Sequence, residues 1–362
     1  MRKSRWLAPW KDSQVRPLIY HLVSRVVDRR FVFGDGEREH FRMLMRMVEN
    51  FSGCRVLSYC IMSNHFHILL EVPPLPEGGL TDGEFEKRLL ATQTEAGVAE
   101  VMKRLATARS EGREDVAKEI IESYTYRMHD LSEFMKSLLQ RFTRWFNRTH
   151  QRTGTLWEER YKSVIVEGGV ASKTIAAYID LNPVRAGMVN DPADYRWSSY
   201  GEAIGGGAKG NGKKARAGLV RALRAHHGVG ADAALWADGV SQEYRRLLLM
   251  AGVEKLESQV TKTGELATKR KRNGMNEEDA AKEAELAGEI PLAKMLRCRI
   301  RYFTDGAVIG SREFVNEAFV NARERFGGKR KDGARKMKGA AAPTSGVLWS
   351  LRDLKKDVAP AG

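Results

Sequence analysis

Two histidines separated by one residue, His65 and His67, have the spacing in this chain that best suits chemistry. They stand at the start of the apolar run Phe66–Val72, after the polar pair Ser63-Asn64 and an earlier apolar run, Val56–Met62. Two such runs around a polar pair predict a β-hairpin. Because strand side chains alternate between faces, both imidazoles leave one face, where they could hold a cation or a phosphate. A strand histidine can also be a hydrogen-bonded core residue, so a third group must decide.

A tyrosine and an asparagine, Tyr178 and Asn182, form a second pair at helical spacing. The segment Ser172–Leu181 predicts a short helix that ends at Asn182-Pro183, because proline disfavours helical geometry in the residue before it. Residues four apart share one face of a helix, so the phenol and the amide point the same way. Taken alone, the tyrosine suits packing and the asparagine suits a helix end.

Basic and aromatic residues gather on and after the predicted helix Leu131–His150. Its basic stripe consists of Arg141, Arg144, Arg148 and Arg152, with Trp145 between them, and further cations are Arg25, Arg160 and Lys162. No acidic residue alternates within the stripe, and cations mixed with stacking rings are typical of single-stranded nucleic acid binding. A solvated charged face is the alternative interpretation.

The composition favours a partner that carries phosphate. The 362 residues include 61 Lys+Arg against 46 Asp+Glu, giving a formal net charge of +15. The three cysteines have no Cys-x-x-Cys spacing, which argues against a zinc ribbon or a disulfide framework and fits a reducing cytoplasm. No apolar run reaches membrane-spanning length, so we expect a soluble cytoplasmic protein with no membrane partner.

The order of predicted elements indicates an α/β (α+β) fold. The strands are Pro17–Val26, the two strands of the hairpin and Tyr161–Glu167, and the helices between them are Glu37–Phe51 and Leu131–His150. The order strand, helix, strand, strand, helix, strand is that of a ferredoxin-like domain, an antiparallel sheet with helices on one face. The helix that carries Tyr178 is an addition after it.

Composition also divides the chain. Residues 1–204 are expected to form one domain with a charged helical insertion at about 76–130, and residues 205–214 a glycine-rich linker. Residues 215–338 are expected to form a mainly helical, basic region that could bind DNA, and residues 339–362 a disordered tail. Within the basic region, Ile290–Arg301 and Ser311–Phe326 could form a helix-turn-helix, with a small helical bundle as the alternative.

Several short motifs follow one another in the order of a known family. They are Tyr20-His21, Met62–His67, Phe146–Arg148, Gly154–Lys162 and Tyr178–Gly187. In these motifs the chain resembles the REP-associated tyrosine transposases, which are single-tyrosine members of the HUH endonuclease superfamily. The resemblance implies that Tyr178 is the nucleophile and that His65, His67 and Asn182 are metal ligands. It spans about Pro17 to Tyr200 and leaves the insertion and the C-terminal region outside the family pattern.

The implied activity is cleavage and rejoining of hairpin-forming single-stranded DNA through a 5′-phosphotyrosine ester. Two neutral imidazoles and an amide suit Mg²⁺ or Mn²⁺ better than zinc. The alternatives are a domesticated DNA-binding regulator that cuts poorly and an RNA-binding module. We expect a monomer or a homodimer.

Overall fold

The computed structural model describes most of the first 253 residues and shorter stretches after them. The described residues are 6–13, 16–206, 210–224, 234–253, 255–260, 266–272, 274–275, 277–278, 281–282, 303–304, 307–326, 328, 330–337 and 348–351.

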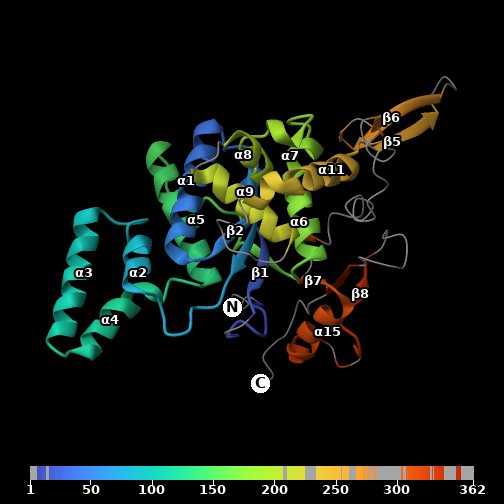
Figure 1. Cartoon of the computed structure of the whole chain (residues 1–362). Helices are drawn as coiled ribbons and strands as arrows, with labels where there is room; N and C mark the ends of the chain where they lie inside the picture. Colours follow the sequence, from blue (N-terminus) through green and yellow to red (C-terminus); the bar gives the residue numbers. More distant parts are fainter. Residues whose placement is uncertain are drawn as a thin grey trace.

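A four-stranded antiparallel sheet forms the centre of the molecule (Figure 1). Its strands are β1 (Leu18–Arg25), β2 (Arg55–Ile61), β3 (His65–Val72) and β4 (Lys162–Val166), in the order β2-β3-β1-β4. Each neighbouring pair of these strands is antiparallel. With one helix after β1 and another before β4, this order confirms the predicted ferredoxin-like arrangement.

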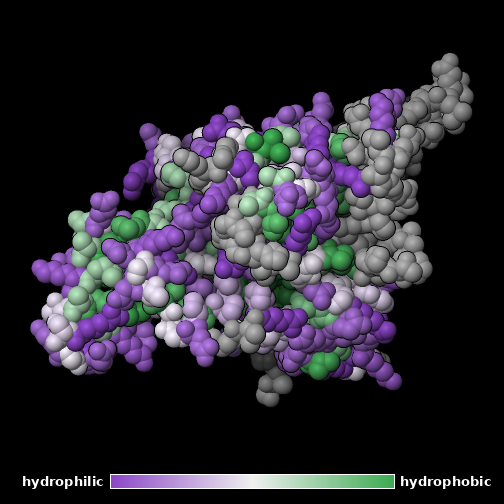
Figure 2. Space-filling view, in the orientation of Figure 1, coloured by the Kyte–Doolittle hydropathy of each residue, from purple (hydrophilic) through white to green (hydrophobic). Residues whose placement is uncertain are grey.

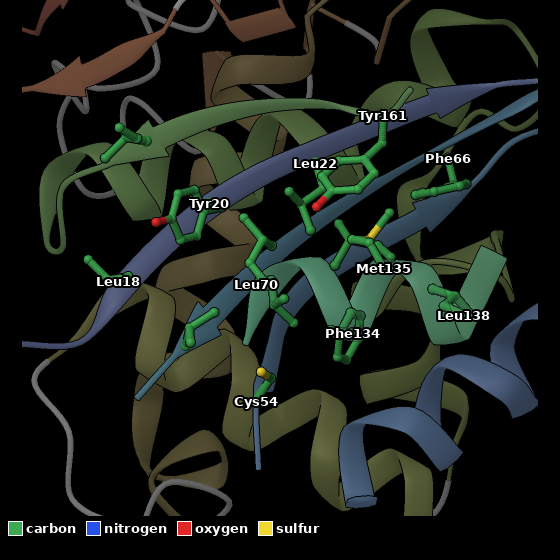
Figure 3. Close-up of a cluster of buried hydrophobic side chains, with 14 of the residues drawn as sticks. Leu18, Tyr20, Leu22, Cys54, Phe66, Leu70, Phe134, Met135, Leu138 and Tyr161 are labelled. Carbon is green, nitrogen blue, oxygen red and sulfur yellow. The ribbon is translucent and has the colours of Figure 1, made fainter. Parts of the chain in front are cut away.

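Two amphipathic helices cover one face of the sheet. Helix α1 (Asp35–Ser52) ends at Gly53, whose φ of 73° is the left-handed conformation that glycine adopts readily. Helix α5 (Leu131–Thr149) begins at Asp130, whose carboxylate accepts a hydrogen bond from the Glu133 backbone N–H at 2.7 Å. Alternate strand residues pack beneath α5, including Tyr20, Leu22, Phe66 and Leu70 (Figure 3).

Further helices cover the opposite face, whereas the sequence predicted helices on one face and the Tyr178 helix only as an addition after the domain. They are α6 (Val170–Asp180), α9 (Gly210–Leu223) and α11 (Ser241–Gly252), and they form a second core with Ile19, Leu57 and Leu69. Helix α9 crosses β2 closely because Gly218 has no side chain. A Cβ atom there would lie 2.4 Å from the carbonyl oxygen of Val56.

The predicted insertion is a separate group of three helices, α2 (Asp82–Leu89), α3 (Glu95–Ser110) and α4 (Glu114–Thr125). Thr81 and Thr94 cap the first two through hydrogen bonds to backbone N–H groups. The three helices share a small apolar core with Phe51 and Met128. They stand beside the sheet (Figure 1), and their visible surface carries hydrophilic side chains with apolar ones among them (Figure 2).

The structure corrects the predicted linker. Residues 210–214 belong to α9, which packs against β2 and against α8 (Ser199–Gly205). The glycine-rich composition predicts a flexible segment. The apolar face of this helix, with Ala215, Leu219 and Val220, instead packs against the sheet. Tertiary packing therefore outweighs the low helix propensity of its glycines.

The C-terminal part also differs from a helical region with a disordered tail. Strand β7 (Val308–Gly310) pairs in parallel with β4, and β9 (Trp349–Leu351) and β8 (Arg335–Lys336) extend the sheet to seven strands. Helix α15 (Arg312–Val320) packs on this extension, and β5 (Lys255–Val260) pairs with β6 (Leu266–Arg272) in a separate hairpin. Residues 335–336 and 349–351 were predicted to lie outside any sheet. They pair with each other, and 349–351 also pair with β7, which is about 40 residues earlier in the chain.

Of the possible helix-turn-helix, the first segment, Ile290–Arg301, lies outside the described residues. The second begins as α15, but the helix ends at Val320 and only a single 3₁₀ turn, Arg323–Arg325, follows. A strand, β7, immediately precedes α15 and joins the central sheet. The described residues therefore place α15 at the edge of the sheet.

Candidate active site

Strand β3 presents the two histidines to the face covered by α6. Phe66, Ile68 and Leu70 enter the core beneath α5, whereas Leu69 belongs to the core on the α6 side. By the two-residue period of a strand, His65 and His67 share the side of Leu69. Their ring centroids lie 5.1 Å apart. The side-chain arrangement predicted from the hairpin is thus the one in the structure.

Helix α6 carries Tyr178 to the same place. The tyrosine is 2% exposed, and its ring meets the His67 ring edge-on at a centroid distance of 5.6 Å. The Phe303 ring lies 4.8 Å away on another side, and the Arg185 guanidinium lies 5.2 Å from the Tyr178 ring centroid. Aromatic and cationic neighbours therefore hold the phenol ring in one orientation.

Asn182 lies just beyond α6, as the first residue of the short helix α7 (Asn182–Arg185) rather than as the end of the preceding helix. The chain continues through Leu181 in helical geometry, and Pro183 occupies the first turn of α7, where its missing N–H costs little. The amide nitrogen of Asn182 donates to the carbonyl oxygens of Tyr178 at 3.1 Å and Ile179 at 3.2 Å. These bonds leave the amide oxygen for another partner.

The side chains of His65, His67, Tyr178 and Asn182 all line one pocket of about 570 Å³. Three of the predicted nucleic-acid contacts, Arg25, Arg160 and Lys162, line it as well. The remaining lining residues are Val23, Ser24, Arg29, Glu158, Glu159 and Thr304. Residues from β1, β3, β4, α6 and the loop before β4 therefore meet here.

Burial keeps the histidines of the site uncharged. It lowers the pKa of His65 to about 4, with the Arg25 charge adding to the effect. It holds the pKa of His67 well below its usual value, and nearby His65, His21 and Arg25 act in the same direction. Neutral imidazoles are the form that binds metal ions.

The donor set fits one divalent ion with open coordination positions. Among the described residues no group of three or more His, Cys, Asp and Glu side chains is arranged around a common metal position. A metal here would therefore depend on the two imidazoles together with the Asn182 amide oxygen. Such a set adds no negative charge, so the ion would keep its full charge for a phosphate.

The arginine stripe of α5 lies elsewhere. Arg141, Arg144, Trp145, Arg148 and Arg152 are all absent from the residues that line the pocket, and their helix covers the other face of the sheet. Arg141, Arg144 and Arg148 are exposed, and no ion pair joins them to any residue that the structure describes.

Two of the predicted contacts in the stripe already have partners within the chain. The Trp145 ring stacks on His40 with centroids 3.8 Å apart, and the Arg152 guanidinium lies 5.7 Å from the Phe146 ring centroid. One face of the Trp145 ring is therefore covered by His40.

The sequence-based assignment of the site omitted His21 and Phe303. His21 is fully buried on β1, with its Nε2 atom 3.0 Å from Nδ1 of His67 and its Nδ1 atom 2.8 Å from the Phe303 carbonyl oxygen. Burial lowers its pKa to about 4. A histidine inside the apolar run of β1 was the available signal for His21. Phe303 has no such signal because it is 282 residues away.

A second pocket, of about 600 Å³, lies between α1, α2, β2 and α9. Three of its cations are paired with carboxylates: Arg221 and Arg55 both pair with Glu71, at 3.0 and 3.3 Å, and Arg88 pairs with Glu84 at 3.0 Å. The Arg221–Glu71 pair joins α9 to β3, the Arg55–Glu71 pair joins β2 to β3, and the Arg88–Glu84 pair lies within α2. We therefore assign this pocket a structural role.

Comparison with known proteins supports the family resemblance over the first part of the site. Residues 14–76 match the family model of IS200-like transposases. The match includes β1 and the hairpin with His65 and His67, and it ends before Tyr178. No curated protein matches the chain.

A solved structure is also similar to part of the chain. It is described as a REP-associated tyrosine transposase bound to a REP hairpin, and it shares 13% sequence identity with this chain. The alignment covers 56% of this chain and 86% of that one, with a TM-score of 0.35. Independently of these comparisons, none of the helices in the described ranges is long and apolar enough to cross a membrane.

Proposed function

We propose that this protein is a transposase-like DNA endonuclease and strand transferase that acts on hairpin-forming single-stranded DNA. The observation that carries the proposal is the meeting of Tyr178, His65, His67 and Asn182 in one pocket with a cationic rim. These residues come from two segments more than 110 positions apart in sequence. A nucleophile, a possible cation site and phosphate-binding side chains within one pocket fit phosphodiester cleavage.

In the proposed reaction, the Tyr178 phenol oxygen attacks the scissile phosphorus. The bond from phosphorus to the 3′ oxygen breaks, the phenol proton is released, and the departing 3′ oxygen takes up a proton. The products are a 5′-phosphotyrosine ester and a free 3′-hydroxyl. Attack of another 3′-hydroxyl on the ester would restore the phenol and join the strands.

The chain's own residues would orient the phosphate for this attack. His65, His67 and the Asn182 oxygen would hold a divalent ion, Mg²⁺ or Mn²⁺. When bound, this ion would supply Lewis-acid polarisation of the phosphate. Arg25, Arg160 and Lys162 at the pocket would bind neighbouring phosphates. Tyr178 lies beside histidines of its own chain, which favours attack within one subunit.

Covalent trapping on DNA tests the proposal. The wild-type protein is incubated with end-labelled hairpin DNA that carries single-stranded flanks and with Mn²⁺, and a denaturing gel then detects label bound to protein. Tyr178→Phe keeps the ring and its contacts but removes the attacking oxygen, so it is expected to bind the DNA and form no adduct.

Tyr126→Phe is the matched control, because Tyr126 is 63% exposed and follows α4, in the helical insertion. It should form as much adduct as the wild type. Peptide mapping of an adduct to any tyrosine other than Tyr178 would contradict the assignment. DNA binding by the wild type without any adduct would instead favour a DNA-binding regulator. Stronger binding to an RNA hairpin of the corresponding sequence than to the DNA would favour an RNA-binding module.

A further inference from the structure

His21 connects the site to the C-terminal part of the chain through both of its ring nitrogens. On β1 it is 0% exposed and stands opposite Leu69 of β3 and Val164 of β4. Its Nδ1 atom lies 2.8 Å from the Phe303 carbonyl oxygen, and its Nε2 atom lies 3.0 Å from Nδ1 of His67. These two contacts form a hydrogen-bonded chain of three groups, from the Phe303 carbonyl through His21 to His67.

The direction of these hydrogen bonds follows from the chemistry of the end group. A carbonyl oxygen only accepts, so the proton between it and His21 sits on Nδ1 of His21. A neutral imidazole carries one proton, which makes Nε2 of His21 the acceptor. Nδ1 of His67 must then donate to it. The lone pair of neutral His67 is consequently on Nε2, the nitrogen that this chain of hydrogen bonds leaves unused.

Asn64 determines in the same way which ring nitrogen of His65 carries the proton. Its amide nitrogen donates to the carbonyl oxygen of Arg29 at 2.8 Å, which identifies the other end of the amide as the oxygen. That oxygen lies 2.7 Å from Nδ1 of His65 and can only accept. Nδ1 of His65 therefore carries the proton, and the lone pair of His65 is also on Nε2.

We propose that His21 and Asn64 are positioning residues that hold His67 and His65 in the Nδ1-protonated tautomer, so that two Nε2 lone pairs are available to one divalent cation. The Phe303 carbonyl is the fixed acceptor for His21, which gives the C-terminal part of the chain a role in the site. The divalent cation is part of the proposed function, so the metal-binding part of this inference rests on that function. The tautomers themselves can be measured without metal or DNA.

The decisive measurement is the nitrogen NMR spectrum of the histidine side chains in the full-length, metal-free protein. Directly bonded and two-bond couplings show which ring nitrogen carries the proton, and spectra of His21→Phe, His65→Gln and His67→Gln assign the rings. Protons on Nδ1 in His21, His65 and His67 are expected. A proton on Nε2 of either His65 or His67 would overturn the proposal, and the wild type alone suffices for this test.

Mn²⁺ affinity, followed by electron paramagnetic resonance, gives a second readout that does not depend on cleavage. His21→Phe keeps a buried ring and removes both nitrogens. Loss of a residue that orients a metal-binding histidine typically weakens metal affinity about 10- to 100-fold, and we expect a loss in this range. His21→Gln, whose amide can still accept from His67, should recover part of the affinity.

Asn64 allows a parallel comparison. Asn64→Asp keeps an oxygen that accepts from His65 and should retain most of the Mn²⁺ affinity, whereas Asn64→Leu should lose it to a similar extent as His21→Phe. His40→Phe is the control, because His40 stacks on Trp145 on the other side of the sheet and lies outside the pocket. Thermal unfolding of each variant separates a lost fold from a lost ligand orientation.

The outcomes separate this inference from the proposed function. Unchanged Mn²⁺ affinity in folded His21→Phe and Asn64→Leu would overturn the inference and leave covalent cleavage by Tyr178 standing. If the tautomers and the Mn²⁺ affinities are as expected but the wild-type protein forms no DNA adduct, the proposed cleavage is contradicted and the inference is supported. Absence of Mn²⁺ binding by the wild type would contradict both.

Discussion

At the scale of single residues, the site consists of neutral or aromatic groups enclosed by the chain. His21, His67 and Tyr178 are each 2% exposed or less. Their rings contact one another at centroid distances of 5.2 to 6.0 Å. The charged residues that line the pocket are four cations, Arg25, Arg29, Arg160 and Lys162, and two carboxylates, Glu158 and Glu159. This net positive charge favours a phosphate.

One buried carboxyl beside this site should make stability depend on pH. Asp180 is fully buried and accepts hydrogen bonds from the Tyr200 backbone N–H at 3.0 Å and the Tyr244 hydroxyl at 2.6 Å. Burial nevertheless raises its pKa to about 7, from an ordinary value of 3.8. The protonated form is therefore favoured in the folded protein.

The stabilising contribution of Asp180 should decrease as the pH rises. Because the folded pKa of Asp180 exceeds the unfolded one, its stabilising contribution is full below about pH 4 and is lost as the pH rises through about 7. Asp180→Asn, which has nearly the same shape, should show a smaller fall in the free energy of unfolding between these limits. Chemical denaturation at several pH values measures it, and an identical pH profile in the variant would refute the assignment.

At the scale of elements, the sheet separates two cationic surfaces. The pocket with Arg25 and Lys162 is on the α6 side, and the α5 stripe with Arg141 and Arg148 is on a helix that covers the other face. We therefore expect the two surfaces to contribute differently: the pocket to the reaction, and the stripe to affinity for a longer nucleic acid.

Salt dependence of DNA binding tests the stripe. Each phosphate contact with single-stranded DNA contributes roughly 0.7 to the slope of log affinity against log salt, so Arg141→Ala with Arg148→Ala should flatten that slope by about 1.4. Adduct formation at saturating DNA should be unchanged. The control is Lys103→Ala with Arg104→Ala on α3, which changes the net charge equally and should leave the slope nearly intact. An equal effect of both double variants would support the solvated-face interpretation.

At the scale of the whole molecule, the C-terminal part completes the sheet and the site together. Strand β7 covers the edge of β4 through hydrogen bonds from the Ile165 and Glu167 backbone N–H groups to Ala307 and Ile309, each 2.9 Å long. Phe303, a few residues earlier, contacts both His21 and Tyr178. The edge strand and the site therefore depend on the same stretch of chain.

Truncation tests this dependence. A chain that ends at residue 302 lacks Phe303, β7 and β9, so β4 becomes an exposed edge and His21 loses its acceptor. We expect a lower midpoint of thermal unfolding and at least a 10-fold loss of Mn²⁺ affinity. A chain that ends at Leu351 retains these elements and serves as the control. Equal midpoints and equal affinities for the two truncated chains would show that the N-terminal part forms the site alone.

The sequence by itself determined the local elements and the pairs of residues that they carry. The two-residue period placed His65 and His67 on one strand face, and the helical spacing placed Tyr178 near Asn182. The apolar stripe of α5 and the order of the strands indicated the ferredoxin-like core. These features follow from contacts between residues close in the chain, and their periodicity is visible in the sequence.

Only the tertiary structure decided which remote groups complete the site. The packing of α9 on β2, the pairing of β7 with β4 and the hydrogen bond from His21 to Phe303 all depend on partners 100 or more residues away. The glycine-rich residues 205–214 alone indicate a linker, and no local pattern shows that Gly218 lies against β2 or that the Phe303 carbonyl accepts from His21. Such contacts gain their free energy from burial and hydrogen bonding across the assembled sheet, which local propensities do not encode.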